Sequence, residues 1–522
     1  MTVDAVAIGA GPNGLVAATV LARAGWSVEL LERRPIAGGA IGSGRTAAGY
    51  LHDWGSAFYG VLHTSPVFAE LGLARRVRWA RTEVPVAAVW DPRRPAAVMR
   101  RTPTGTAEGL GVDAAAWLDT VAWWHRLGGP LFEAMMGPVG APRPLARVVA
   151  RSTPRELVAT ARQLLEPVEE WVRLRYGTTA ARMLFAAHAT HADVGVDAAG
   201  SMPPAMLLAM AAQQHGMPVP VGGAQNLAAA LTEAAVEAGV VVRTGVEVTG
   251  IDVRGGRAVG VRCRDGGWVG VRRAVVADVA PARLARDLVG EQHLAGAWLD
   301  QLRRHRYAGG YFRLDVDLSA PAPWADERLR EAMVVHVTGD LDALAVSQAQ
   351  VRRRLLPAEP QLIVGQQDRA DPSRVPPGAA SLWVECHCPA TPAGDAAGEL
   401  AEGWQAGFAD RILGRLETQA PGLRDLVVDT TVAAPLDLER RDPNLVGGDV
   451  AGGSAALDQM LVFRPVAGWS SYALPVGGVY MCGAASHPGG GVHGMAGRNA
   501  ARTVLRDARL GLPWMRARTA RA

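Results

Sequence analysis

GAGPNG at residues 9–14 lies between an apolar run and an alanine-rich stretch, close to the start of a chain of 522 residues. Its glycines have separate roles: Gly9 makes a tight turn, Gly11 lets the backbone approach a pyrophosphate, and Gly14 lets a helix pack on the preceding strand. A helix that begins here directs its free N–H groups toward phosphate. The stretch therefore predicts the first strand, turn and helix of a nucleotide-binding α/β fold.

A carboxylate follows this motif at the distance that a ribose contact requires. The pattern predicts a helix over residues 15–24, ended by Gly25, and a second strand over residues 26–31. Glu32 then stands at the end of that strand, about 20 residues after the motif, where an acidic side chain accepts hydrogen bonds from a ribose. A glycine turn without a ligand is the alternative interpretation, and the complete setting of strand, turn and helix argues against it.

A glycine pair favours a flavin dinucleotide over NAD. Arg33 follows the predicted ribose contact, and Gly38-Gly39-Ala40 comes shortly afterwards. Backbone without side chains can pass close to the phosphates of a flavin nucleotide. Seen alone, the pair could also be an ordinary turn. Because this glycine pair comes soon after the predicted ribose contact, we interpret it as part of an FAD site.

A second glycine-rich segment lies near the other end of the chain. Residues 479–501 predict a strand, a loop that contains Gly483 and Gly491, and a helix that begins near Val492. The N-terminus of such a helix presents free N–H groups to an anion or to the electron-rich edge of a ring. A reduced flavin develops negative charge at such an edge, and a fixed dipole stabilises that charge. We therefore expect this segment to complete the flavin site.

Together, these motifs resemble those of the phytoene desaturase-related flavoproteins, the carotenoid and retinoid oxidoreductases. The resemblance is closest to bacterial members of the branch called pyridine nucleotide-disulfide oxidoreductase domain-containing protein 2. It also rests on residues 222–227, 244–251, 463–470 and 482–491, and it is stronger at both ends of the chain than in the middle. It implies FAD as the cofactor, and it implies that Val248 touches the adenine half of FAD.

The predicted FAD contacts come from all of these segments. In chain order they are Gly9, Gly11, Pro12, Asn13, Gly14, Glu32, Arg33, Gly38, Gly39, Ala40, Val248, Gly483, Gly491 and Val492. His487, in the glycine-rich loop, is the candidate catalytic residue, because an imidazole beside a flavin can shift protons during oxidation. The alternative is that His487 only shapes the loop.

The cysteines argue against disulfide oxidoreductase chemistry. The chain has four, Cys263, Cys386, Cys388 and Cys482, and no C-x-x-C pair among them. No second G-x-G-x-x-G motif follows a strand, so we expect FAD as the only nucleotide and no direct NAD(P)H half-reaction. Cys386-His387-Cys388 lacks the partner pair that a zinc site needs, so we expect no metal and interpret these cysteines as buried strand thiols.

The basic residues narrow the function further. All 54 are arginine, and a chain without lysine cannot use a Schiff-base lysine or a P-loop lysine. The net charge of +4 comes from arginines spread along the chain, so we expect no nucleic acid partner.

Few cysteines and the lack of a secretory leader predict a cytoplasmic protein. The composition, rich in arginine, alanine and glycine, suggests a bacterial source with GC-rich DNA.

The order of these segments predicts an α/β protein with two interleaved domains. A discontinuous, Rossmann-type FAD-binding domain of the amine oxidase and phytoene desaturase type takes residues 1–75, 215–289 and 456–510; an α+β substrate domain takes 76–214 and 290–455; residues 511–522 form a disordered tail. In the substrate domain we expect helices over 114–127, 154–174 and 203–214, and strands over 311–316, 333–337 and 381–386.

The substrate side carries one ambiguous pattern. Met202, Met206 and Met210 recur every fourth residue, so their thioethers could line an apolar tunnel or touch a membrane face. Such a stripe is more often part of a core. No apolar run approaches the roughly 20 residues that span a bilayer, so we expect no transmembrane span, and peripheral contact at most.

These observations lead to one hypothesis and two alternatives. We expect an FAD-dependent oxidoreductase that removes hydride from a carbon of an apolar or polyene-like small molecule, as a desaturase does, with oxygen or a quinone as electron acceptor. If the electrons return to the same substrate, the reaction is an isomerisation. The alternatives are a flavin amine or amino-acid oxidase, and a non-catalytic flavoprotein that acts through a partner.

Overall fold

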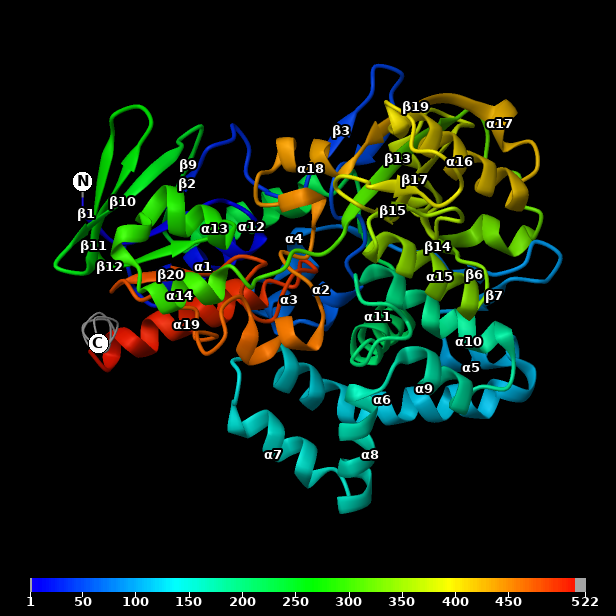
Figure 1. The fold of residues 1–522 in the computed structure, drawn as a ribbon, viewed down its shortest axis with the longest axis horizontal. Helices are drawn as coiled ribbons and strands as arrows, with labels where there is room; N and C mark the ends of the chain where they lie inside the picture. Colours follow the sequence, from blue (N-terminus) through cyan, green and yellow to red (C-terminus); the bar gives the residue numbers. More distant parts are fainter. Residues whose placement is uncertain (1, 512–522) are drawn as a thin grey trace.

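A computed structural model describes residues 2–511 and shows two sheets side by side with helices around them (Figure 1). Apart from Gly511, the predicted tail at 511–522 lies outside the described residues. The two layered sheets with covering helices confirm the predicted α/β class. Within the described range, no helix is both long enough and apolar enough to cross a bilayer.

The first sheet is the nucleotide-binding one and follows the strand order β10-β11-β12-β1-β2-β9, with β20 also paired to β12. Its strands are β1 (Thr2–Ile8), β2 (Val28–Glu32), β9 (Val240–Thr244), β10 (Val248–Arg254), β11 (Arg257–Cys263), β12 (Trp268–Ala277) and β20 (Val479–Met481). Strand β1 is parallel to β2 and β12, whereas β10 and β11 form an antiparallel hairpin. Gly255 and Gly256 make its turn with φ values of 57° and 76°, as a tight hairpin requires.

Helices α1 (Pro12–Arg23), α12 (Gln225–Glu237) and α19 (Met495–Arg509) pack in one core cluster against this sheet. Helices α1 and α19 approach closely at Gly497, which has no side chain. A Cβ there would lie only 2.1 Å from the carbonyl oxygen of Asn13. The expected helix start near Val492 is wrong: Val492 and Gly494 have φ values of 52° and 69°, so the helix begins only at Met495. The two ends of the chain therefore meet in this core.

The second sheet follows the order β19-β13-β17-β16-β14-β6-β7. Its strands are β6 (Val84–Val89), β7 (Ala97–Met99), β13 (Gly310–Leu318), β14 (Ala332–Val337), β16 (Leu362–Gly365), β17 (Ala380–Cys388) and β19 (Val427–Ala433). Its pairings are antiparallel except for β14 with β6. The shorter strands are β3 (Ser43–Arg45), β4 (Leu51–Asp53), β5 (Trp79–Ala80), β8 (Val219–Pro220), β15 (Leu355–Leu356) and β18 (Gly394–Asp395).

The remaining helices pack against one sheet or the other, or connect the two. They are α2 (Gly60–Thr64), α3 (Pro66–Glu70), α4 (Leu73–Arg76), α5 (Pro103–Glu108), α6 (Ala114–Met136), α7 (Pro142–Ala150), α8 (Pro154–Leu165), α9 (Val168–Arg175), α10 (Thr179–Ala186), α11 (Met202–His215), α13 (Pro281–Arg283), α14 (Gly296–Leu302), α15 (Leu341–Arg352), α16 (Trp404–Gln419), α17 (Leu423–Leu426) and α18 (Pro435–Arg441). The single helix expected over 154–174 is two helices, because Pro167 disfavours helical backbone at Glu166.

The methionine stripe belongs to the core. Met202, Met206 and Met210 are 0%, 3% and 1% exposed, and they pack with Trp117 and Trp124. They therefore stabilise the helical layer beside the second sheet, and their side chains meet neither a tunnel nor a membrane. The predicted domain boundaries stay a prediction, although the first sheet takes its strands from three separated parts of the chain.

Candidate FAD site

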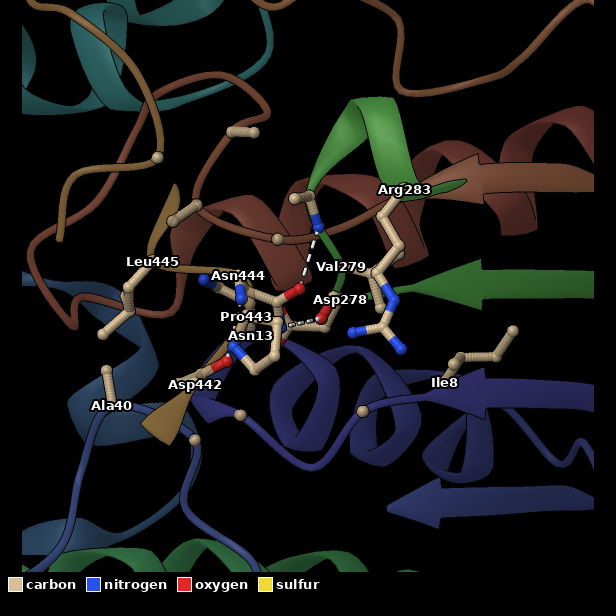
Figure 2. A pocket seen from close by; sticks show the side chains of 18 of the residues that line it. Ile8, Asn13, Ala40, Asp278, Val279, Arg283, Asp442, Pro443, Asn444 and Leu445 are labelled. Carbon is tan, nitrogen blue, oxygen red and sulfur yellow. Dashed lines mark hydrogen bonds between the residues drawn. The ribbon is translucent and has the colours of Figure 1, made fainter. Parts of the chain in front are cut away.

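A groove runs along the carboxyl ends of the parallel strands β1, β2 and β12, and Figure 2 shows the side chains that line it. Ile8 ends β1, Glu32 ends β2, and Asp278 directly follows β12. Ligands of open α/β sheets bind at this edge, because the loops and helix N-termini converge there. The fold therefore places the predicted glycine motif on the wall of a groove.

Backbone forms most of the wall beside α1. Gly11 is the N-cap of α1 and Pro12 its first residue, so the first N–H groups of the helix have no partner within it. A Cβ on Gly39, where φ is +54°, would lie 2.8 Å from the Cα of Gly11. The two glycine segments thus touch, and side chains there would fill the space that a pyrophosphate needs. This cradle fits FAD.

Glu32 is held in position by backbone donors. Its Oε2 accepts a hydrogen bond from the N–H of Ala10 at 2.8 Å, and its Oε1 accepts one from the N–H of Arg34 at 2.8 Å. The side chain lines the groove and the residue is 7% exposed. A carboxylate oxygen can accept more than one hydrogen bond, so Glu32 retains capacity for a ribose hydroxyl.

The structure brings most of the predicted FAD contacts together. All of them except Gly14 and Gly38 line the groove, from Glu32 and Val248 at one end to Gly491 and Val492 at the other. Gly14 and Gly38 lie behind the wall, where a Cβ would come within 2.1 Å and 2.3 Å of a backbone oxygen. Their contact with FAD stays a prediction, but their closeness to other backbone is a direct structural role.

His487 does not line the groove. It is 1% exposed, and its Nε2 lies 2.8 Å from the carbonyl oxygen of Gly137. Burial lowers the pKa of His487 to about 4, so the ring is neutral at pH 7 and its Nε2–H donates to that carbonyl. The catalytic role stays a prediction, and this geometry favours the alternative, in which His487 ties the glycine-rich loop to the end of α6.

The sequence analysis missed the opposite wall of the groove. Asn444 donates from Nδ2 to the carbonyl oxygen of Asp278 at 3.2 Å and accepts the N–H of Ala280 at 3.0 Å (Figure 2). The loop from Asp442 to Leu445 is thereby fixed across the end of β12. Of these residues, only Asp278 could have been recognised from the sequence, because it is a polar residue directly after an apolar strand. The Asn444 contact joins residues 166 positions apart, and no local pattern reveals it.

Arg283 also extends into the groove (Figure 2). The free volume of this partly open groove is about 140 Å³. Pockets for drug-sized ligands measure about 300–1,000 Å³, so FAD needs more room than this. The Arg283 side chain is 27% exposed and reaches Glu247 at 3.5 Å, a long and partly solvated contact. We therefore expect Arg283 to swing outward when FAD binds.

Asp278 is an unusual carboxyl group for a site that binds a diphosphate. Its Oδ2 accepts the N–H of Gly14 at 2.9 Å. Burial raises the pKa of Asp278 to about 7; the Gly14 hydrogen bond opposes this rise, and the carboxylates of Asp442 and Glu32 add to it. Since all of these groups lie along one groove, protonation of Asp278 reduces the negative charge that FAD must meet.

We expect an Asp278→Asn variant to gain stability relative to the wild type as the pH rises. Ionisation of Asp278 destabilises the folded protein, because its pKa is raised from 3.8 to about 7, and each pKa unit corresponds to about 1.4 kcal/mol. This cost is absent below pH 4, grows between pH 4 and pH 7, and is constant above. Unfolding free energies at several pH values should show a difference between variant and wild type that widens by a few kcal/mol. A difference independent of pH would contradict the assignment.

A second cavity of about 670 Å³ lies next to the groove, and Tyr307 lines both. The other polar residues around it include Asp193, Gln348, Arg354 and His387. Burial raises the pKa of Tyr307 to about 12, so its hydroxyl is protonated at neutral pH. Among the described residues this buried hydroxyl has no hydrogen-bond partner. The volume suits a small molecule, and Tyr307 lies where that molecule and FAD would meet.

Two buried cysteines flank His387, which lines the second cavity. Among residues 2–511, no group of three or more His, Cys, Asp or Glu side chains is placed to bind one. Cys386 and Cys388 are buried on β17, as predicted for strand thiols. His387 between them bonds through Nε2 to the carbonyl oxygen of Thr190 at 2.8 Å.

Comparison with known proteins points to flavoenzymes. The model of the family described as flavin containing amine oxidoreductase matches residues 13–329. The chain is 28% identical to pyridine nucleotide-disulfide oxidoreductase domain-containing protein 2 from Mus musculus, over 97% of this chain and 93% of that protein. It is 26% identical to hydroxyneurosporene desaturase from Cereibacter sphaeroides, over 96% of this chain and 97% of that protein.

A solved structure shows the same fold. A variant of putrescine oxidase superposes with a TM-score of 0.59 at 16% sequence identity, covering 98% of this chain and 99% of the other. At this identity the similarity concerns the arrangement of the sheets and helices. The substrate chemistry has to come from the site itself.

Proposed function

Because the chain belongs to the flavin containing amine oxidoreductase family and is an FAD-dependent oxidoreductase, we propose that it removes hydride from a carbon of an apolar or polyene-like small molecule. The observation that carries this proposal is the second cavity, which adjoins the FAD groove at Tyr307. Bound FAD supplies the acceptor for the hydride. The name of the relative hydroxyneurosporene desaturase supports a desaturation.

In this proposal the residues of the chain orient the substrate, and they take little part in proton transfer. Within the described residues, the candidate His487 is turned toward Gly137 and away from the groove. Burial lowers the pKa of His387, which lines the second cavity, so it is a neutral ring at pH 7. Holding a C–H bond against FAD can supply roughly 7–11 kcal/mol through orientation alone. Desaturation also releases a proton from the neighbouring carbon; this proton becomes acidic as the hydride leaves, so a water molecule can accept it and no strong base is required.

The same proposal includes the acceptor that takes the electrons from the reduced flavin. Oxygen or a quinone would accept them in a desaturation, and the substrate itself would take them back in an isomerisation. The four cysteines are free and buried, which supports a reducing, cytoplasmic setting.

The test is anaerobic reduction of the FAD-loaded protein. The flavin absorbance bands should bleach with polyene or other hydrocarbon-like substrates and not with NADPH. Bleaching by amines, with peroxide released in air, would replace the proposal by an amine oxidase. No bleaching with any substrate class would favour a flavoprotein that acts through a partner.

Filling the second cavity should stop turnover without removing FAD. We expect Ala390→Trp, on the cavity wall, to lower kcat/KM about 100-fold, because the indole excludes or displaces the reacting carbon. The control is Ala397→Trp, which adds the same side chain at an exposed position. Both variants should keep the flavin spectrum of the wild type. Unchanged kcat/KM in Ala390→Trp would show that the substrate binds elsewhere.

A further inference from the structure

The wall of the second cavity carries a buried hydrogen-bond donor without a partner. Gln348, on α15, lines the cavity and is 4% exposed. Its Oε1 accepts the N–H of Val196 at 2.8 Å, whereas its Nε2 has no hydrogen-bond partner within residues 2–511. Because a backbone N–H can only donate, this hydrogen bond fixes which end of the amide is oxygen. Buried donors are normally paired, so the NH₂ group of Gln348 is available to a ligand.

The charged residues around the cavity are mainly cationic. Those that line it are Arg306, Arg352, Arg354 and Asp193. Asp193 is the only carboxylate that the described residues contribute to the wall, and its Oδ1 already accepts the N–H of Ala455 at 2.8 Å. The cavity therefore offers little to a cationic group such as an amine, and more to an anion.

Arg354 is the arginine whose charge is left uncompensated. Arg306 pairs with Asp458 at 2.8 Å. Arg352 lies 3.4 Å from Asp197. Within the described range Arg354 forms no ion pair. It is an exposed residue of the cavity wall, so it lies where the cavity opens to solvent.

Gln348 and Arg354 come from one short stretch of chain. Gln348 lies in the last two turns of α15, and Arg354 follows two residues after the helix ends. The Arg354 side chain is held at the wall, because its Nη2 donates to the carbonyl oxygen of Thr391 at 3.0 Å. Charge-assisted hydrogen bonds to carboxylate oxygens are strong, and one uncompensated arginine matches one negative charge. Much of the remaining wall is apolar and includes Val194, Ala308, Val351 and Val446.

We propose that the substrate carries a carboxylate at one end, for which Gln348 and Arg354 form the subsite. The Nε2–H of Gln348 donates to a carboxylate oxygen, and Arg354 supplies the compensating positive charge. The hydrocarbon chain then lies along the apolar wall toward Tyr307, beside the FAD groove. This inference rests on the proposed function, because it takes the second cavity as the chamber of the substrate.

The test is calorimetric titration of the full-length, FAD-loaded protein with dodecanoic acid and with dodecan-1-ol, two probes of equal chain length. The acid should bind about tenfold more tightly or better, because hydrogen bonds to charged groups are the stronger ones. Ala390→Trp, in which an indole fills the cavity, should abolish binding of the acid. The proposal is overturned if the alcohol binds as tightly as the acid, if neither probe binds, or if Ala390→Trp binds the acid like the wild type.

A failure of this inference can be told apart from a failure of the proposed function. Titration measures binding alone, so equal affinities for acid and alcohol would remove the carboxylate subsite and leave the hydride-transfer test untouched. Acid-selective binding by a protein whose flavin no compound bleaches would instead remove the proposed function and keep the subsite.

A substitution of Gln348 tests the buried donor. Gln348→Glu keeps an oxygen for the N–H of Val196 and replaces the free donor with a second carboxylate oxygen. It should weaken binding of the acid about tenfold or more and leave binding of the alcohol nearly unchanged. The matched control is Gln350→Glu on the same helix, because Gln350 does not line the cavity and its Oε1 likewise accepts a backbone N–H. Equal losses in the two variants would overturn the role of Gln348.

A substitution of Arg354 tests the uncompensated charge without disturbing a buried residue. Arg354→Gln should also weaken binding of the acid about tenfold, because it removes the charge that the carboxylate meets. The matched control is Arg353→Gln, which removes the same charge from the neighbouring exposed residue, outside the cavity wall. If both variants bound the acid alike, the arginines would act only through the general charge of the surface, and the subsite would be wrong.

Discussion

A Gly14→Ala variant is expected to be purified nearly free of flavin. The new Cβ would lie 2.1 Å from the carbonyl oxygen of Gly9 and 3.2 Å from the Cβ of Asp278, and the nearer of these atoms is backbone that cannot rotate away. Helix α1 must therefore shift from β1, and its N-terminal N–H groups leave the positions from which they meet phosphate. We expect FAD affinity to fall at least 100-fold, or about 3 kcal/mol.

The measurement is flavin absorbance per protein, followed by FAD titration of the apoprotein. Gly129→Ala is the matched control: Gly129 lies inside helix α6, and a Cβ there would have no neighbouring atom within 4 Å. Because alanine favours helix over glycine, this control should keep its FAD and its stability. A Gly14→Ala protein with full FAD occupancy would show that the close contact at Gly14 does not position the site.

An Arg374→Met variant is expected to lose about 3–5 kcal/mol of unfolding free energy, the usual effect of leaving a buried carboxylate unpaired. Arg374 is 1% exposed, and its Nη1 lies 2.9 Å from Oδ2 of Asp53. The same guanidinium donates to the carbonyl oxygen of Pro220 and lies 3.3 Å from a carboxylate oxygen of Asp371. The arginine thus joins β4, β8 and a turn between β16 and β17.

Denaturant unfolding measures this loss. Arg93→Met breaks a surface pair with Asp91, in which the arginine side chain is 86% exposed, and should cause no measurable change, because solvent screens that pair. Adding Asp53→Asn to Arg374→Met should recover part of the stability, because it removes the unpaired charge. If Arg374→Met were as stable as the wild type, water would have to reach Asp53, and the buried network would be misplaced.

Much of the FAD site could be predicted because its motifs are local. Residues 9–14 and Glu32 belong to one strand, turn, helix and strand unit, and glycine is required there whatever the rest of the chain does. The family assignment and FAD followed from these residues together with the loop around Gly483 and Gly491. The catalytic prediction at His487 could not be tested by the sequence, because the direction of a side chain in a glycine-rich loop depends on what packs beside it.

The sequence alone determined the α/β class, the glycine-lined edge of the first sheet and the cofactor. Only the tertiary structure decided that the methionine stripe is core, that Asn444 fastens a distant loop across Asp278, and that the second cavity meets the groove at Tyr307. Backbone motifs arise from conformational preferences of neighbouring residues, so they can be read locally. Cavities and exposed faces arise from contacts between segments far apart in the chain, so the apolar side chain of Met206 on helix α11 is buried while that of Val158 on helix α8 stays in water.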